Sequence, residues 1–242
     1  MNSELLINLQ KLGEEKKTRI IALEKCDNFI SSATDQAAYG DSYSFFGRMR
    51  ETGEALPSIF EDIDKETFLK GVDRRVRPYL RSQLFIALIS ELEDFISQVL
   101  YFVLSSYPKK IDDMQINLVD IIELKEIDSI IDYAISIELN RLFYSSPKEY
   151  RKKIEEILSM DHTLLDPIWL SYIEMKARRD LGVHNQWKLN NVYKSKVLNA
   201  GGTIPTSKYL LINKEYFSTS LNNSHTLLNI LLLHCENKFG EK

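Results

Sequence analysis

An arginine and a histidine near the end of a predicted helix have the clearest potential for chemistry. Arg179 and His184 stand in the run KARRDLGVHN, residues 176–185. Arginine is a permanent planar cation that suits a phosphate, and histidine exchanges a proton near neutral pH. Such a pair can cleave RNA through its own 2′-hydroxyl, with histidine as general acid or base and arginine stabilising the charge on phosphorus. DNA lacks that hydroxyl, so this chemistry predicts RNA as the substrate.

The spacing of the pair sets a geometric condition. On a regular helix, residues five apart lie about 140° apart and do not meet side by side. Gly182 predicts that the helix ends near it, which would let the two side chains converge. Asp180 lies four residues before His184, on the same face, and is expected to orient the imidazole. The same spacing is also typical of cations paired with acidic neighbours at a helix C-terminus, without any catalytic role.

A basic stretch surrounds these residues in an acidic chain. The 242 residues include 31 Lys and Arg against 35 Asp and Glu, a net charge of −4. Between Lys176 and Lys214, eight cations accompany one carboxylate, a local charge of +7 that leaves −11 for the rest. With Trp187 and Tyr193 interleaved, the stretch predicts phosphate contact and base stacking. The residues expected to contact RNA are Arg178, Asn185, Lys188, Lys194 and Lys196.

Other features exclude several classes of function. A second basic cluster, at Arg74, Arg75, Arg77 and Arg81, is interpreted as an ordinary solvated face. The sequence has no metal-ligand spacing, no phosphate-binding glycine loop and no nucleophile elbow, so neither a metal nor a cofactor is expected. With two distant cysteines, no apolar run of membrane-spanning length and no secretory signal at the N-terminus, the sequence predicts a cytoplasmic protein without a membrane partner.

The apolar spacing predicts an all-α fold. Helical stripes occur at residues 5–30, 78–105 and 117–144, in a short charged helix from Pro147 to Leu158, and in the last helix. Asp166 and Pro167 predict the start of the helix that carries Arg179. Residues 209–213 are expected to form a short strand or an extended arm before the last helix. We expect residues 1–77 to be an N-terminal helical extension with an aromatic loop at Tyr39–Phe46, and residues 78–242 to form the main helical domain.

These residues resemble the HEPN superfamily, and in particular its RiboL-PSP-like branch. Members carry an Arg, usually followed by a polar residue, and then a His four to six residues after the Arg, at a helix end. Here that pattern is Arg179-Asp180-Leu181-Gly182-Val183-His184, and VHNQWKLNNVYKSKV is similar to the stretch that follows the motif. The runs LFIALISELEDFISQVL and LLINKEYFSTSLNNSHTLLNILL resemble an earlier helix and the final arm and helix of that branch. The likeness covers roughly residues 78–242.

The resemblance implies a HEPN-like helical bundle that forms a homodimer, with two Arg–His pairs facing each other in one composite cleft. It implies a metal-independent endoribonuclease, of a kind often deployed as a toxin or as an antiphage effector in abortive infection, with an antitoxin or defence-system partner. Arg179 and His184 would be the catalytic pair, and Asp180 would take the polar position. Two features depart from the family pattern: Trp187 replaces the usual glycine, and Arg178 offers a second register.

Two other functions fit the same residues. Many HEPN-like domains are inactive and serve as dimerising scaffolds or regulators, so a non-catalytic binding module is one alternative. The other is a sequence-tolerant DNA-binding protein that uses the stretch from Lys176 to Lys214, although no helix-turn-helix pattern accompanies it.

Overall fold

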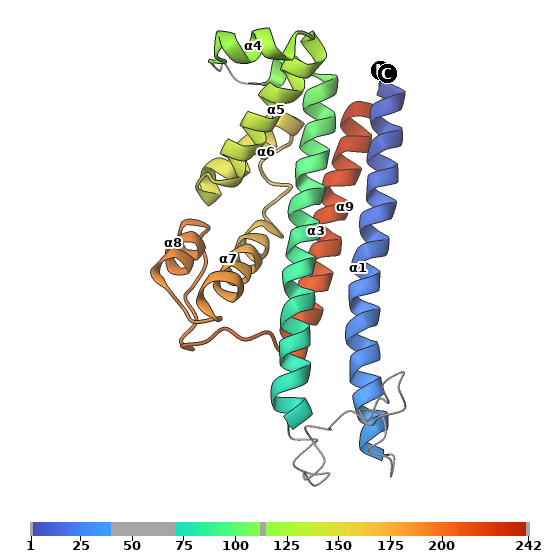
Figure 1. The fold of residues 1–242 in the computed structure, drawn as a ribbon, viewed down its shortest axis with the longest axis vertical. Coiled ribbons are helices and arrows are strands. Elements are labelled where there is room, and N and C mark those ends of the chain that lie inside the picture. The colour runs from blue at the N-terminus through green and yellow to red at the C-terminus, as the bar shows by residue number, and fades with distance from the viewer. Residues whose placement is uncertain (1, 40–70, 112–114, 241–242) are drawn as a thin grey trace, which may run out of the picture.

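The computed structural model describes residues 2–39, 71–111 and 115–240, which form helices and no strand (Figure 1). The all-α class predicted from the sequence is therefore confirmed. The aromatic loop predicted at Tyr39–Phe46 lies, beyond Tyr39, outside the described residues. The elements in chain order are α1 (Asn2–Tyr39), a π-helical turn (Val72–Val76), α3 (Arg77–Ser106), a 3-10 turn (Pro108–Lys110), α4 (Leu118–Leu124), α5 (Ile127–Phe143), α6 (Pro147–Leu158), α7 (Trp169–Asn185), α8 (Asn191–Asn199) and α9 (Lys214–Gly240).

Three long helices form an elongated bundle that carries the shorter helices on one side (Figure 1). Helices α1 and α9 both pack along α3 and against each other, while α5, α6 and α7 pack against α3, and α8 packs on α7. Helix α3 is therefore the central element, with α1 on one side and α7 on another. The boundary predicted at residues 77 and 78 falls at the start of this helix.

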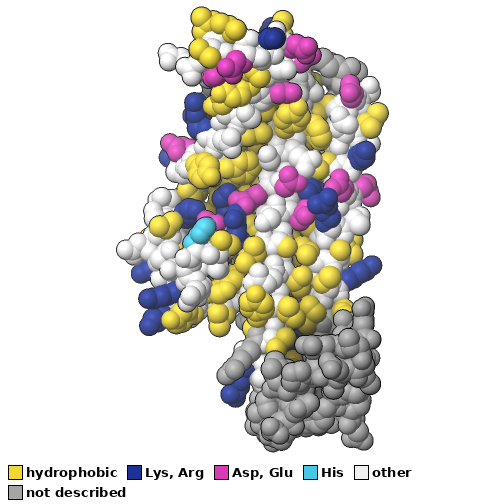
Figure 2. Space-filling view, in the orientation of Figure 1, with side chains coloured by type: hydrophobic (Ala, Val, Ile, Leu, Met, Phe, Trp, Pro, Cys, Tyr) yellow, Lys and Arg dark blue, Asp and Glu magenta, His cyan; other side chains and the backbone are white. Residues whose placement is uncertain are grey.

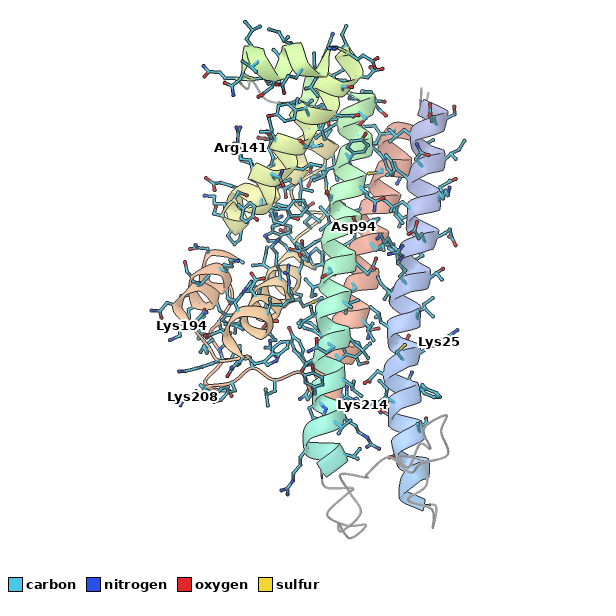
Figure 3. All side chains as sticks on the ribbon, viewed as in Figure 1. Lys25, Asp94, Arg141, Lys194, Lys208 and Lys214 are labelled. Atoms are coloured by element: carbon cyan, nitrogen blue, oxygen red, sulfur yellow. The ribbon has the colours of Figure 1, made fainter. Side chains whose placement is uncertain are left out.

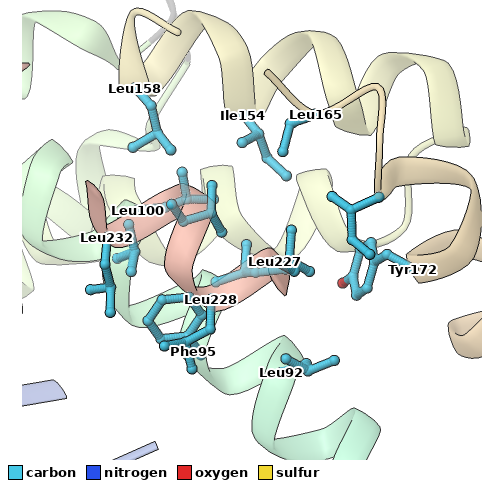
Figure 4. Packing of buried hydrophobic residues seen from close by; sticks show 14 of the residues in the cluster. Leu92, Phe95, Leu100, Ile154, Leu158, Leu165, Tyr172, Leu227, Leu228 and Leu232 are labelled. Carbon is cyan, nitrogen blue, oxygen red and sulfur yellow. The ribbon is translucent and has the colours of Figure 1, made fainter. Parts of the chain in front are cut away.

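The core follows the apolar stripe of α3. Phe85, Leu88, Leu92, Phe95 and Val99 are all fully buried, as their spacing predicts. Figure 4 shows this stripe meeting leucines of α9 and the apolar face of α6, and its labelled residues include Leu92, Phe95, Leu100, Ile154, Leu158, Leu227 and Leu228. This close packing fixes α3 against α9, so side chains on the remaining faces of α3 hold defined positions.

Ion pairs join the C-terminal half of α1 to the beginning of α3. Cys26, within the stripe predicted at residues 5–30, is exposed. Asp27 takes the inward position instead, and its Oδ1 accepts a hydrogen bond from Nε of Arg81 at 2.9 Å with both side chains buried. Arg77 binds Asp35 at 2.5 Å. These two arginines of the second basic cluster therefore have structural partners on α1.

A buried lysine makes the strongest polar link between these two helices. Lys16 is 1% exposed, and its ammonium donates to Oε2 of Glu91 at 2.7 Å and to Asp94. Arg19 adds a second cation 3.0 Å from Glu91. Burial alone would raise the pKa of Glu91, but its hydrogen bonds with Lys16 and Arg19 lower it overall. Burial lowers the pKa of Lys16, but the carboxylates of Asp94 and Glu91 raise it by more, so that the pKa is higher than its ordinary value.

The single helix predicted at 117–144 is wrong, because the chain breaks it in two. Lys125 adopts a φ of 60° and Glu126 is extended, so α4 ends and α5 restarts. Val119, Ile122 and Ile127, which belong to the apolar stripe predicted at residues 117–144, are exposed. Only the part of the stripe that reaches α3, from Ala134 onward, is buried.

The segment around the candidate site differs from the sequence prediction in two places. Helix α7 begins at Trp169, and the carboxylate of Asp166 binds Arg151 at 2.6 Å rather than capping the helix. Helix α8 has no counterpart in the prediction, although Oδ1 of Asn190 caps it by accepting from the Tyr193 N–H at 2.9 Å. The predicted arm is extended and is tied to α7 by the Leu210 N–H, which donates to the Trp187 carbonyl at 2.9 Å.

Candidate active site

A cleft of about 710 Å³ lies over α7, between α3, the end of α5 and α8, and both Arg179 and His184 line it. Of the other predicted site residues, Asp180 and Lys196 also line the cleft, whereas Arg178, Asn185, Lys188 and Lys194 do not. The structure thus brings together the pair, the adjacent carboxylate and one of the five residues predicted to contact RNA. Further lining side chains come from α3 and from the C-terminal end of α5, namely Glu93, Asp94, Ser97, Asn140, Phe143 and Tyr144.

The pair reaches the cleft from a helix that stays regular. Helix α7 continues to Asn185, so the prediction that it ends near Gly182 is wrong. Lys176, Asp180 and His184 recur at intervals of four, which places them on one face, and Arg179 lies beside that face. The cleft is broad enough to receive side chains from this whole arc, so no break is needed to bring the two residues into one cavity.

Gly182 has a packing role in place of the predicted turn. A Cβ at this position would lie inside van der Waals contact of the Trp187 ring, which folds back over the helix. The reversal occurs at Gln186 and Trp187, whose φ values are 50° and 62°. These are left-handed conformations that glycine adopts most easily. The indole also contacts Phe85 of α3, with ring centroids 6.2 Å apart, so it anchors the end of α7 to the core.

Arg179 is held by a carboxylate from α3. Its Nη2 donates to Oε2 of Glu93, whose other oxygen accepts from the ammonium of Lys176. The Nε of Arg179 is buried and makes no hydrogen bond within the described part of the chain, although Asp180 Oδ1 lies 3.5 Å away. The guanidinium is therefore fixed in orientation between Glu93 and Asp180 at the wall of the cleft.

Asp180 does not orient the imidazole as predicted. Its Oδ2 accepts from Nζ of Lys196 at 2.9 Å, and its Oδ1 faces Nε of Arg179. The cation on α8 thus takes the carboxylate that His184 was expected to bind. His184 is exposed and has no hydrogen-bond or ion-pair partner among residues 2–39, 71–111 and 115–240. Its ring nitrogens are therefore accessible for hydrogen bonds with a bound molecule.

Arg178 points away from the cleft and is bound on all sides. Its Nε donates to Oε1 of Glu174 at 2.7 Å, and its guanidinium stacks 3.7 Å from the ring centroid of Tyr216. The hydroxyls of Tyr193 and Tyr216 also donate to Glu174, at 2.7 and 2.5 Å. The two arginines that could pair with His184 therefore have different places. Arg179 lines the cleft, whereas Arg178 joins α7 to α8 and α9.

The aromatic residues predicted to stack on bases serve the fold. Tyr193 is buried at the α7–α8 contact, and burial together with the Glu174 carboxylate raises its pKa well above the usual value. Trp187 packs on α3 and covers Gly182. Their amphipathic spacing within a basic run therefore reflects packing rather than an exposed stacking surface.

The remaining basic residues of the stretch lie outside the cleft. Figure 3 shows Lys194 on α8 and Lys208 on the arm at the outer edge of the molecule, far from Asp94 on α3. Figure 2 shows this edge as a group of Lys and Arg atoms. Lys188 is exposed, and Nδ2 of Asn185 donates to its carbonyl at 2.5 Å. These lysines therefore form a basic edge that is separate from the cleft.

Charges in the cleft nearly cancel. Its lining contributes three permanent cations and three carboxylates, so its net charge is zero while the imidazole is neutral: Lys176, Arg179 and Lys196 against Glu93, Asp94 and Asp180. A phosphate entering the cleft would compete with Glu93 and Asp180 for their cations. The arrangement can hold one phosphate between a fixed guanidinium and a free imidazole.

Glu93, Asn140 and Tyr144 are lining residues that sequence reasoning missed. Glu93 stands 86 residues from Arg179 in the chain, and Tyr144 follows a helix that was predicted to be continuous. The position of Glu93 off the apolar stripe of α3 places it on another face, but nothing in the sequence says which helix that face meets.

Comparisons with known proteins return no match to this chain, whether the search is against family models, curated proteins or solved structures. Among the described residues, no three His, Cys, Asp or Glu side chains gather in a way that could hold a metal ion. Within the same ranges, no helix has both the length and the apolar character needed to cross a bilayer.

Proposed function

We propose that this protein is a metal-independent endoribonuclease of the HEPN type, acting in the cytoplasm as a toxin or antiphage effector of abortive infection. One observation carries the proposal. Arg179 and His184 line the same cleft, with the arginine fixed by Glu93 and the histidine exposed and without a partner in the described ranges. A positioned cation beside a free imidazole is the equipment that the chemistry requires.

In the proposed reaction the imidazole of His184 removes the proton from a ribose 2′-hydroxyl. The 2′-oxygen attacks phosphorus, the bond from phosphorus to the 5′-oxygen breaks, and the leaving 5′-oxygen receives a proton from the imidazolium. The guanidinium of Arg179 donates to the phosphoryl oxygens, where negative charge builds up. The products are one strand ending in a 2′,3′-cyclic phosphate and one beginning with a 5′-hydroxyl.

The backbone at residue 187 supports the family assignment. The HEPN branch carries a glycine there, and Trp187 adopts a φ of 62°, the conformation that glycine favours. A positive φ at this position is consistent with the glycine of that pattern. The homodimer with a composite cleft and the antitoxin or defence-system partner belong to the same proposal. Val183, next to His184 in the chain, is half-exposed and offers apolar surface that a second protomer could cover.

A non-catalytic binding module is the second candidate, and the balanced charge of the cleft favours it. Because each lining cation already faces a carboxylate, the cleft attracts RNA less than a basic groove would. A scaffold or regulator that binds a partner through this region would show the same geometry. Binding of RNA without cleavage distinguishes this function from the first.

The deciding experiment incubates purified protein with total RNA in excess chelator, beside the His184→Ala variant. We expect cleavage by the native protein only, with 2′,3′-cyclic phosphate ends detected by their resistance to ligation until the phosphate is opened and removed. Cleavage by both proteins, or none by either, would reject the nuclease proposal. Light scattering of the same samples measures whether the chain is a dimer.

A further inference from the structure

A smaller cavity of about 100 Å³ opens beside the catalytic cleft and shares part of its wall. Phe143, Tyr144, Lys176 and Lys196 line both spaces, and Tyr150 and Ile173 are among the residues that close the smaller one. We call this cavity the side slot. Its volume equals that of roughly three water molecules, which is the scale of a single aromatic ring.

Aromatic rings and aliphatic carbons form most of the wall of the side slot, and Ser145, Lys176 and Lys196 complete it. Phe143 and Tyr150 contact each other with centroids 5.7 Å apart, and the hydroxyl of Tyr150 is already satisfied by that of Tyr172 at 3.1 Å. The slot therefore favours a flat, weakly polar group over water. The ammonium of Lys176 lies 5.2 Å from the Phe143 ring centroid and 5.4 Å from that of Tyr150, so the slot also carries a cation that both cavities share.

Tyr144 stands at the entrance with its ring unused. It is 92% exposed, yet it occupies a well-fixed corner between α5 and α6. The Ser145 N–H donates to the Leu142 carbonyl at 3.1 Å, and Ser146 forms a capping box with Glu149. A large aromatic side chain held in water by a rigid backbone, at the junction of two cavities, is suited to stack on a planar ligand.

We propose that the side slot binds a nucleobase, stacked on Tyr144, while the cleft holds the phosphate attached to the same nucleotide. This inference rests on the proposed function and specifies its substrate. The two cavities share Phe143, Tyr144, Lys176 and Lys196 as lining residues, so a base in the slot and a phosphate beside Arg179 can belong to one nucleotide. The base must be unpaired, since a base that stays stacked within a duplex cannot enter the slot. The size of the slot favours a single ring, such as uracil.

Binding is tested in the His184→Ala variant, so that no substrate is consumed. The probes are a uridine tetranucleotide and the same ribose–phosphate chain without bases. We expect the uridine strand to bind about ten-fold more tightly, the effect of one stacked base. Tyr144→Ala in the same background should abolish the difference, and Tyr144→Phe should retain it. Tyr79→Ala, at an exposed tyrosine on α3 outside both cavities, is the matched control and should change nothing.

Photocrosslinking locates the base directly. Irradiation of the His184→Ala protein with a 4-thiouridine tetranucleotide should attach the base to the peptide containing Phe143 and Tyr144. Equal affinity for the strands with and without bases, or crosslinks confined to α8 and the arm, would overturn the assignment. The result is independent of cleavage. Base-dependent binding without any nuclease activity would reject the proposed function and retain the slot, and cleavage unaffected by Tyr144→Ala would do the reverse.

Discussion

Two groups of ion pairs involve residues of α3 that lie within one helical turn of each other. They differ in whether polar groups beside them are left without a partner. Glu91 and Asp94 face α1 and enclose Lys16, which is buried and bound by both carboxylates. Glu93 faces α7 and binds Lys176 and Arg179 at the wall of an open cleft. Beside the second group are a free imidazole and a guanidinium nitrogen that makes no hydrogen bond in the described chain. A saturated group of charges stabilises the fold, whereas an unsaturated one can act on a ligand.

The largest effect is expected at the free imidazole. His184→Ala should reduce RNA cleavage about a thousand-fold, in the range of general acid–base catalysis. The melting temperature should stay the same, because His184 is exposed and has no partner in the described residues. Initial rates of cleavage and a thermal melt on one preparation measure both. A clear fall in melting temperature would show that the residue is structural and would break the comparison.

Adjacent arginines on α7 provide a matched pair. Arg179→Ala should lower cleavage about a hundred-fold with little loss of stability, since it removes the donor that stabilises the transition state. Arg178→Ala should cost about 2 kcal/mol of unfolding free energy, because it removes a charged hydrogen bond and the contact with Tyr216. Urea unfolding and cleavage rates separate the two. The same response from both variants would contradict the division of roles.

Two glutamates of α3, two residues apart, test the same division from the other side. Glu91→Gln should cost about 2 kcal/mol of stability and leave cleavage unchanged, because its partners are Lys16 and Arg19. Glu93→Gln should lower cleavage about ten-fold by loosening Arg179, with a smaller loss of stability. Chemical denaturation and kinetics of each variant are the measurements. Full activity in Glu93→Gln would show that Arg179 is positioned without it.

The smallest expected effect is a pH dependence of the unfolding free energy that comes from Glu91, the partner of the buried Lys16. The pKa of Glu91 in the folded protein is below its ordinary value of 4.5. The ionised carboxylate therefore stabilises the fold fully above pH 4.5, and this stabilisation is lost as the pH falls through the folded pKa. Lys16 has a raised pKa and keeps its charge throughout this acid range. The native protein should therefore lose more stability than Glu91→Gln, by about 1 kcal/mol, between pH 6 and pH 3. Parallel curves for the two proteins would refute this.

Local signals in the sequence predicted some elements well. Helix α6 has the predicted bounds because Pro147 sets its start and Ser146 with Glu149 forms a capping box, which are signals within four residues. The stripe of α3 is long and regular enough to be read directly. The break at Lys125 was missed because it depends on how far α5 follows α3, which is a tertiary property.

The site was predictable only in part. Arg179 and His184 were identified from their types and spacing, and the structure places both in one cleft. The partners of the site residues were not predictable. Glu93, which binds Arg179, stands 86 residues away in the chain, and Lys196, which binds Asp180, lies on a helix that was not predicted. The expected bond from Asp180 to His184 is wrong for the same reason: the helix allows it, but a cation from α8 competes for the carboxylate.

The indole of Trp187 lies between Gly182 and Phe85, at the end of the helix that carries His184. The chain has only one other tryptophan, Trp169, which is buried at the opposite end of α7 among tyrosines. The tryptophan emission of a Trp169→Phe protein would therefore come from Trp187 alone, at the end of the helix that carries Arg179 and His184. Any movement of this helix end when RNA or a protein partner docks would be visible as a change in wavelength or intensity, without attachment of a dye.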